Sequence, residues 1–226
     1  MMQPHFRSVG AHALLVEFDT EVSDIGNQAV IALDQALNTA EIKGLQEVVP
    51  AFVSLLVEFD PLITDHIAIE NAIQSLLPTS TAKEDNYRHH TALVCYDEDL
   101  APDLIAVAEA SDMSVDAVIK GHLSGDYKIC MYGFAPGYAY MAGVPKILHI
   151  PRKSAAVRDI PAGSVLIAGP QCLITTLTMP TGWSIIGSSP TEVLLTDPEQ
   201  PFLFDVGDHV SFERVDRETY EQKKKH

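Results

Sequence analysis

The sequence predicts a two-domain α+β protein: a small ferredoxin-like α+β domain at the N-terminus, followed by an all-β domain that forms a barrel or a sandwich. Three observations lead to this prediction. The 226 residues exceed the usual size of one domain. Helical and strand patterns alternate up to about residue 96, and from residue 127 onward short apolar runs are separated by glycine and proline. The polar segment Lys83–Arg88 favours a boundary that gives domains at 1–86 and 87–226.

The first domain has a β-α-β-β-α pattern. Its expected elements are a strand at Ala13–Phe18, a helix at Ile25–Ala40, strands at Leu45–Val49 and Phe52–Phe59, and a helix from Asp60 to Leu76. Ser23 or Asp24 is a suitable N-cap for the first helix, and Gly44 follows its end. One more strand near His90–Tyr96 would complete the split β-α-β arrangement of ferredoxin-like domains.

The second domain begins with two short helices, expected at Pro102–Ala110 and Ser114–His122, and no helix is expected after them. Short strands separated by turn residues follow, at Tyr127–Tyr132, Ser164–Ala168, Cys172–Leu177, Trp183–Ile186, Val193–Thr196 and His209–Phe212. The lysine-rich end, Lys223–His226, is expected to be a solvated, frayed tail.

The composition excludes several classes of protein. A formal net charge of -16 argues against general binding to nucleic acid or to anionic membranes. No apolar run is long enough to span a membrane and the first residues do not resemble a signal peptide, so we expect a cytoplasmic protein. Cys95, Cys130 and Cys172 form no C-x-x-C pair, which favours buried thiols and predicts no metal site.

One stretch departs from the acidic average. Residues 127–191 contain five basic residues against one acid, and seven of the 13 glycines and seven of the 14 prolines. Glycine permits unusual backbone angles and proline restricts the chain, so this pattern predicts a shaped, cationic surface suited to an anionic ligand or an acidic partner. An ordinary β-barrel with a chance charge bias remains the alternative.

The usual catalytic motifs are absent, including phosphate loops, dinucleotide-binding loops, zinc-protease motifs and nucleophile elbows. Four other phrases stand out, at Tyr132–Tyr140, Pro151–Lys153, Ile160–Val165 and Pro180–Trp183. In this order and spacing they resemble the allophanate hydrolase subunit 1 family, which includes the PxpB component of 5-oxoprolinase and the kinase inhibitor KipI. The resemblance extends over nearly the whole chain, since Val9–Phe18, Val48–Pro61 and Pro102–Ala108 also match the family's pattern.

The resemblance implies a cyclophilin-like β-barrel as the second domain. It implies a subunit of an ATP-dependent 5-oxoprolinase-type complex, inactive alone, that opens 5-oxo-L-proline to L-glutamate with ATP hydrolysis. The expected partners are a subunit-2 homologue (PxpC- or KipA-like), a third LamB/YcsF-like subunit and a small amide substrate, with ATP and Mg at the complex. Two alternatives remain: a KipI-like regulator that inhibits a histidine kinase, and a carboxyltransferase or allophanate hydrolase-type subunit of urea amide metabolism.

Candidate catalytic residues are His122, Arg152 and Arg158. The two arginines suit a phosphate or a carboxylate, unless they are solvated charges at the barrel rim. The imidazole of His122 suits acid–base chemistry near pH 7, unless it caps the preceding helix or packs in the core. The candidate residues for binding substrate or nucleotide are Gly133, Phe134, Pro136, Gly137, Tyr138, Tyr140, Lys153, Pro161, Gly163, Ser164, Gln171 and Trp183.

The chain departs from the family pattern at three places. The Thr-Gly phrase expected after Gln171 is missing, Met179–Trp183 replaces Ser-Pro-Gly-Gly-Trp, and Gly187–Pro190 replaces Gly-Arg-Thr-Pro. The last change puts Ser188 where the family phrase has an arginine, and so removes a permanent charge. These departures imply either an altered ligand or a family member that binds a partner without turnover.

Overall fold

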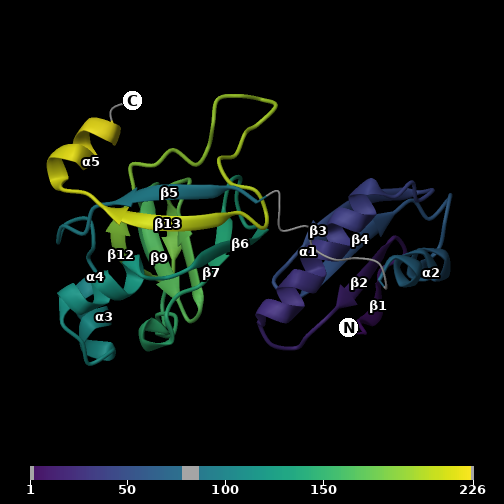
Figure 1. Ribbon diagram of the computed structural model, residues 1–226, viewed down its shortest axis with the longest axis horizontal. Helices are drawn as coiled ribbons and strands as arrows, with labels where there is room; N and C mark the ends of the chain where they lie inside the picture. Colours follow the sequence, from purple (N-terminus) through teal and green to yellow (C-terminus); the bar gives the residue numbers. More distant parts are fainter. Residues whose placement is uncertain (1–2, 78–86, 225–226) are drawn as a thin grey trace. The chain divides into compact units, whose positions relative to one another are not determined.

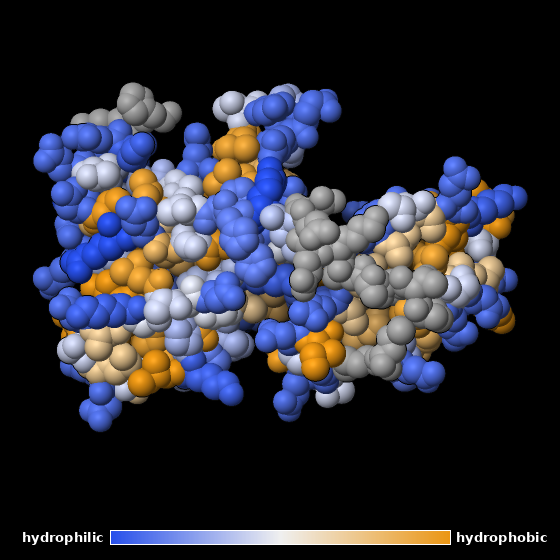
Figure 2. Space-filling model, in the orientation of Figure 1, coloured by the Kyte–Doolittle hydropathy of each residue, from blue (hydrophilic) through white to orange (hydrophobic). Residues whose placement is uncertain are grey.

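The computed structural model describes residues 3–77 and 87–224. Contacts divide the chain into two compact units, Met1–Asn86 and Tyr87–His226 (Figure 1). Hydrophilic residues cover most of the face seen in Figure 2, and apolar residues lie there in separate patches. No helix within the described residues is long and apolar enough to cross a membrane.

The first unit is a four-stranded antiparallel sheet with two helices. Its elements are β1 (His5–Val9), β2 (Ala13–Glu17), α1 (Asp24–Thr39), β3 (Leu45–Pro50), β4 (Ser54–Phe59) and α2 (His66–Leu76). The strand order is β1-β2-β4-β3, and every neighbouring pair is antiparallel. Both helices contribute to one apolar core with the sheet, for example Leu33 of α1, Val57 of β4 and Ile73 of α2. Strands β2, β3 and β4 and the two helices have the ferredoxin-like arrangement.

The prediction of the outer strand of this sheet is wrong. The strand near residue 90, β5 (His89–Val94), pairs with a strand of the second unit instead. Its place beside β2 is taken by β1, which the sequence did not predict. Four of the five β1 residues are exposed, so β1 lacks the alternation of buried and exposed side chains that marks a strand.

The start of helix α1 was predicted correctly, whereas the start of α2 was not. Helix α1 begins as expected, because Ser23 Oγ accepts a hydrogen bond from Gly26 N at 3.1 Å. Helix α2 begins six residues later than Asp60, because Asp60 forms a turn, accepting from Leu62 N through its carboxylate. The cap of α2 is Asp65, which accepts from Ala68 N at 2.8 Å.

The second unit holds a seven-stranded sheet, with two helices between its first two strands in chain order and one helix after its last strand. Its elements are β5, α3 (Leu104–Ala110), α4 (Val115–Leu123), β6 (Tyr127–Tyr132), β7 (Ala139–Ala142), the 3₁₀ turn η2 (Lys146–Leu148), β8 (Val157–Ile160), β9 (Ser164–Ala168), β10 (Gln171–Ile174), β11 (Met179–Thr181), β12 (Ser184–Ser188), β13 (His209–Arg214) and α5 (Arg217–Lys224). The sheet order is β12-β9-β10-β7-β6-β13-β5, and β8 and β11 form a separate pair. Figure 1 shows β5 and β13 side by side.

The sheet curls into a nearly closed barrel. Cys95, just after β5, and Ser188, at the end of β12, exchange two backbone hydrogen bonds of 2.9 Å, which join the two outer strands of the sheet. Gly187 permits this approach, because a Cβ at that position would lie 2.7 Å from a methyl carbon of Val94. The expected fold class, an α+β protein whose second part is a β-barrel, is confirmed.

Several local expectations for the barrel are wrong. The C-terminal end is helix α5 through Lys224, anchored by the buried ring of Tyr220, where a frayed tail was expected. Lys225 and His226 lie outside the described residues. Val193–Thr196 forms no strand, only an isolated bridge between Leu194 and Phe202. Strands β7, β8 and β11, each of three or four residues, were not predicted.

A buried carboxylate joins the start of β5 to the turn before β13. Asp208 is 2% exposed and accepts hydrogen bonds from the backbone of Arg88 and Asp205 and from His90 Nε2, at 2.8–2.9 Å. Burial by itself would raise the pKa of Asp208, but these hydrogen bonds outweigh it and hold the pKa below its usual value. The charged carboxylate therefore fixes this corner of the barrel.

We predict that Asp208→Asn lowers the free energy of unfolding of the barrel by about 2 to 4 kcal/mol, because an amide oxygen cannot replace an ionised acceptor in a buried network. Urea titration followed by the emission of Trp183 measures this, since Trp183 is the chain's one tryptophan and belongs to this unit. The control, Asp126→Asn, alters a side chain that is 90% exposed and is expected to change stability by less than about 0.5 kcal/mol. Equal effects of the two variants would contradict the role given to Asp208.

Candidate functional site

A pocket of about 300 Å³ lies at one side of the barrel unit and is walled largely by aromatic side chains. We call it the aromatic pocket; it is lined by Phe134, Tyr138, Tyr140, Arg152, Lys153, Ala156, Leu173, Pro180, Thr181, Gly182 and Trp183. Six of these residues are among the sequence-predicted site residues: Phe134, Tyr138, Tyr140, Arg152, Lys153 and Trp183. They come from the β6–β7 loop, β7, the segment before β8, and the turn between β11 and β12.

The aromatic rings form a continuous row. The ring centroid of Tyr138 lies 5.5 Å from that of Phe134 and 6.0 Å from that of Tyr140, and Tyr140 is 5.9 Å from Trp183, all edge-on. The guanidinium carbon of Arg152 lies 5.5 Å from the Trp183 ring, a cation–π contact. The pocket therefore presents an apolar wall with a positive charge at one end.

The loop between β6 and β7 shapes the other end of the row. Phe134 has a positive φ of 72° and is 73% exposed, an unusual combination for a large apolar residue. Gly137 has a φ of 68°, which favours glycine, and a Cβ there would lie 2.6 Å from a methyl carbon of Leu194, which would have to shift. The loop is held by hydrogen bonds from Gly133 N to Tyr138 O and from Tyr138 N to Ala135 O.

Two cations line the aromatic pocket, Lys153 and Arg152, and only one of them is paired with a carboxylate. Lys153 Nζ lies 2.5 Å from Asp103 Oδ2, which also accepts from Ile185 N at 2.7 Å. The charge of Lys153 is thus neutralised within the wall of the pocket. No carboxylate among residues 3–77 and 87–224 lies within ion-pair distance of Arg152, so Arg152 is the cation available to a ligand here.

The phenols of the pocket are hydrogen-bond donors at neutral pH. Burial raises the pKa of Tyr138 to about 12, and the nearby Tyr140 adds to the effect. Burial also raises the pKa of Tyr140, although the charge of Arg152 opposes it. Both hydroxyl groups consequently stay protonated and can donate to a carbonyl or carboxylate oxygen.

His122 is a core residue in this structure, which corrects the expectation that it acts as a catalytic acid or base. Its side chain has no exposed surface and lies between Tyr96, whose hydroxyl is 2.7 Å from Nδ1, and Cys172, whose sulfur is 3.6 Å from Nε2. Burial lowers the pKa of His122 to about 3. A neutral imidazole enclosed in this way cannot exchange protons with a ligand at the surface.

The remaining predicted residues are distributed around the barrel. Arg158 is exposed on β8 and lies outside both pockets described here. Gln171 begins β10 and pairs with Ala168 and Ala142, also outside both pockets. Pro161 and Ser164 build the turn before β9, where Ser164 Oγ donates to Pro161 O at 2.8 Å.

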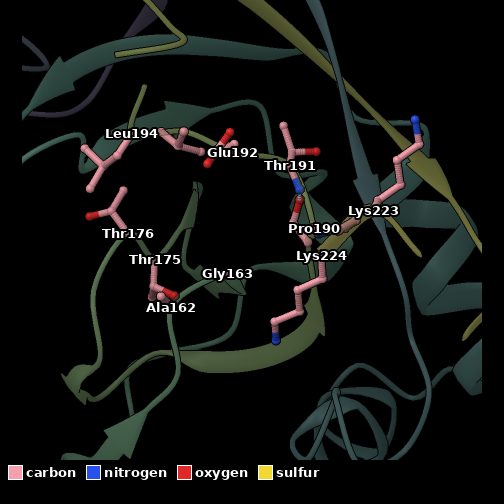
Figure 3. Close-up of a pocket in the computed structure, with 12 residues that line it drawn as sticks. Ala162, Gly163, Thr175, Thr176, Pro190, Thr191, Glu192, Leu194, Lys223 and Lys224 are labelled. Carbon is pink, nitrogen blue, oxygen red and sulfur yellow. Dashed lines mark hydrogen bonds between the residues drawn. The ribbon is translucent and has the colours of Figure 1, made fainter. Parts of the chain in front are cut away.

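A second pocket, of about 400 Å³, lies near helix α5 (Figure 3). We call it the C-terminal pocket; it is lined by Ala162, Gly163, Thr175, Thr176, Ser189, Pro190, Thr191, Glu192, Val193, Leu194, Lys223 and Lys224. Of the predicted residues it contains only Gly163. The two lysines of this pocket were not among the predicted site residues, because a frayed tail was expected where helix α5 returns to the barrel.

The two pockets flank the same loop. Pro136, in the loop that bears Phe134, accepts a hydrogen bond through its carbonyl from Thr176 of the C-terminal pocket, at 2.7 Å. Leu194, which also lines that pocket, packs where a side chain on Gly137 would lie.

No group of three or more His, Cys, Asp or Glu side chains in the described part of the chain is placed to hold a metal ion.

A family model, curated proteins and solved structures each match most of this chain. A family model of the carboxyltransferase domain, subdomain C and D, matches residues 4–204. A Bacillus subtilis (strain 168) protein named as the B component of 5-oxoprolinase is 33% identical over 223 residues, which cover 94% of this chain and 93% of that protein. The solved structure of TTHA0988 is 32% identical with a TM-score of 0.79, and the matched region covers 91% of this chain but only 40% of that one.

A more distant structure shares the fold alone. K. lactis urea amidolyase matches 97% of this chain and 15% of its own with a TM-score of 0.78, at 16% identity.

We predict that the buried, neutral His122 makes the barrel less stable in acid. Because its folded pKa of about 3 is below the ordinary 6.5, the unfolded state binds the proton more tightly, so stability falls as the pH drops from 6.5 towards 3. The loss amounts to about 1.4 kcal/mol per pH unit. Urea titrations across this range are expected to show a slope smaller by about that amount in His122→Gln, since the carboxylates titrate alike in both proteins. Identical slopes would show that His122 is not buried in the neutral form.

Proposed function

The chain belongs to the carboxyltransferase domain, subdomain C and D, family, and from this premise we propose that it is the PxpB-type component of an ATP-dependent 5-oxoprolinase. Such a complex opens 5-oxo-L-proline to L-glutamate with hydrolysis of ATP. The name and near full-length match of the Bacillus subtilis relative support a subunit of a hydrolase-type complex. Relatives from Escherichia coli O157:H7 and Haemophilus influenzae, 32% and 30% identical, carry the same name.

The aromatic pocket is the observation that carries the proposal. 5-Oxoproline is a flat five-membered lactam with one carboxylate. Its ring can pack against the row of aromatic side chains, and its carboxylate can pair with the guanidinium of Arg152 in a two-pronged contact. The hydroxyl of Tyr138 or Tyr140 can then donate to the lactam oxygen. A volume of about 300 Å³ is ample for one such molecule.

The chemistry explains why this chain would act only within a complex. A lactam carbonyl is a poor electrophile, and transfer of the γ-phosphoryl group of ATP to its oxygen converts that oxygen into a leaving group. Water then adds to the carbon, the C–N bond breaks and the nitrogen takes a proton, which leaves γ-glutamyl phosphate. A second water attacks this acyl phosphate, and phosphate departs to leave glutamate. In this scheme the described residues bind and orient the lactam, and positioning of this kind accelerates reaction without a protein nucleophile.

Other subunits would supply the rest of the machinery. We propose a subunit-2 homologue (PxpC- or KipA-like) and a third LamB/YcsF-like subunit as partners, with ATP and its Mg bound by the complex. Among the described residues, no three carboxylates or imidazoles gather at one place, so we propose that the Mg ion is held chiefly by the nucleotide phosphates and the other subunits. Three free, buried cysteines are compatible with a reducing, cytoplasmic location.

The other functions raised by the sequence have less support. A carboxyltransferase role would rest on the description of the matched family and on the likeness to urea amidolyase, and at 16% identity that likeness concerns the fold alone. A role in restraining a histidine kinase has no observation specific to it in the described residues.

We predict that Arg152→Ala raises the KM for 5-oxoproline at least tenfold in ATP hydrolysis by the reconstituted complex. The reason is the loss of a charge-assisted pair worth about 1.5 to 3 kcal/mol. The matched control is Arg158→Ala, which removes the same charge from the exposed strand β8, outside the pocket. It is expected to leave KM and kcat unchanged.

Equal effects of the two substitutions would argue that Arg152 acts only through the general charge of this surface. A complex that assembles with the wild-type chain but hydrolyses no ATP in response to 5-oxoproline would overturn the proposed function itself.

A further inference from the structure

The C-terminal pocket brings together positive charge and hydroxyl groups from distant parts of the chain. Lys223 and Lys224 come from the last turn of α5, whereas Ser189 and Thr191 follow strand β12 (Figure 3). One carboxylate, that of Glu192, also lines the pocket, so the lining carries more positive than negative charge. Within the described residues, neither lysine has a carboxylate oxygen within 4.0 Å.

Lys224 is held in place by a chain of hydrogen bonds. Its ammonium donates to the hydroxyl of Tyr220 at 2.9 Å, and that hydroxyl lies 2.9 Å from Ser188 Oγ. Ser188 Oγ in turn donates to the carbonyl of Gly163, a lining residue, at 3.4 Å. The Tyr220 ring is buried, which fixes the hydroxyl, and two protons of the ammonium remain for a ligand.

Figure 3 shows the side chains of the two lysines pointing in different directions, with that of Lys224 extending towards the side of Ala162 and Gly163. Lys224 is therefore the lysine that this hydrogen-bond chain directs to the pocket. The serine that anchors the chain, Ser188, stands at the position of the missing arginine noted in the sequence. Positive charge at this place is thus supplied by α5 instead of β12.

Two hydroxyl groups add donors on the other side of the pocket. Ser189 Oγ accepts from Thr191 N at 3.1 Å, and Thr191 Oγ1 accepts from Leu93 N at 3.0 Å. Each oxygen is thereby fixed while its own proton has no acceptor among the residues that the structure describes. Fixed hydroxyl protons across the pocket from an ammonium suit a ligand that offers several acceptor oxygens.

We propose that the C-terminal pocket binds a phosphoryl group, with the ammonium of Lys224 as the charged contact and the hydroxyls of Ser189 and Thr191 as further donors. A phosphoryl group presents three acceptor oxygens and up to two negative charges, which match this donor set better than a single carboxylate does. The two candidate sources of this group, ATP and a phosphorylated lactam, follow from the proposed function. The inference that the pocket binds a phosphoryl group does not depend on that function.

The test is isothermal titration of the full chain with inorganic pyrophosphate, ATP or glutamate at fixed ionic strength. We expect pyrophosphate to bind the wild-type chain and Lys224→Gln to raise its Kd at least tenfold. Tyr220→Phe, which keeps the charge but removes the hydroxyl that holds it, is expected to raise the Kd about threefold. The control Lys120→Gln removes an equal charge from the last turn of α4 and is expected to have no effect.

Several outcomes overturn the inference: no binding of pyrophosphate, equal Kd values for Lys224→Gln and the wild type, or Lys224-dependent binding of glutamate in place of pyrophosphate. Tighter binding of ATP than of pyrophosphate supports the inference with a nucleotide as source, and equal binding supports it with the phosphoryl group alone. Lys224 is exposed, so its substitution is expected to preserve the fold even if Tyr220→Phe does not. An inactive complex with intact binding would count against the proposed function only.

Discussion

The bridge between Cys95 and Ser188 is the constraint on which the rest of the barrel depends. It joins the two outer strands of the sheet, and Gly187 makes it possible by leaving room for Val94. The parallel pairing of β5 with β13 brings the start and the end of this unit together. Helix α5 therefore begins beside β12, where Tyr220 reaches Ser188 and the C-terminal pocket forms. The contact that closes the barrel at Ser188 therefore also places the helix that lines this pocket.

Much of the fold could be predicted because strong local signals agreed with the tertiary structure. Strands β6 and β9 have the bounds expected from their apolar runs, and Ser23 and Ser114 cap helices α1 and α4. The failures have physical causes. Strand β1 is exposed and gives no alternation, and α5 is polar apart from Tyr220, so its position depends on contacts that no local pattern reports.

The site was partly predictable for the same reason. Aromatic residues close to one another in sequence, Phe134, Tyr138 and Tyr140, do lie together, and the structure adds Trp183 and Arg152 to the row. The environments of single side chains were not predictable. His122 is enclosed by strands far away in sequence, and Lys153 is paired with Asp103, fifty residues earlier. Sequence spacing identifies which residues gather at one end of a barrel, whereas burial and ion pairing decide which of them can meet a ligand.

The proposed binding of 5-oxoproline in the aromatic pocket can be measured directly, because the chain has one tryptophan. Trp183 lines this pocket, so a chain labelled with 5-fluorotryptophan gives one ¹⁹F resonance from the site within an assembled complex of unlabelled partners. We expect 5-oxoproline to shift this resonance in a saturable manner. An unchanged resonance, in a complex that hydrolyses ATP in response to 5-oxoproline, would show that the lactam binds elsewhere.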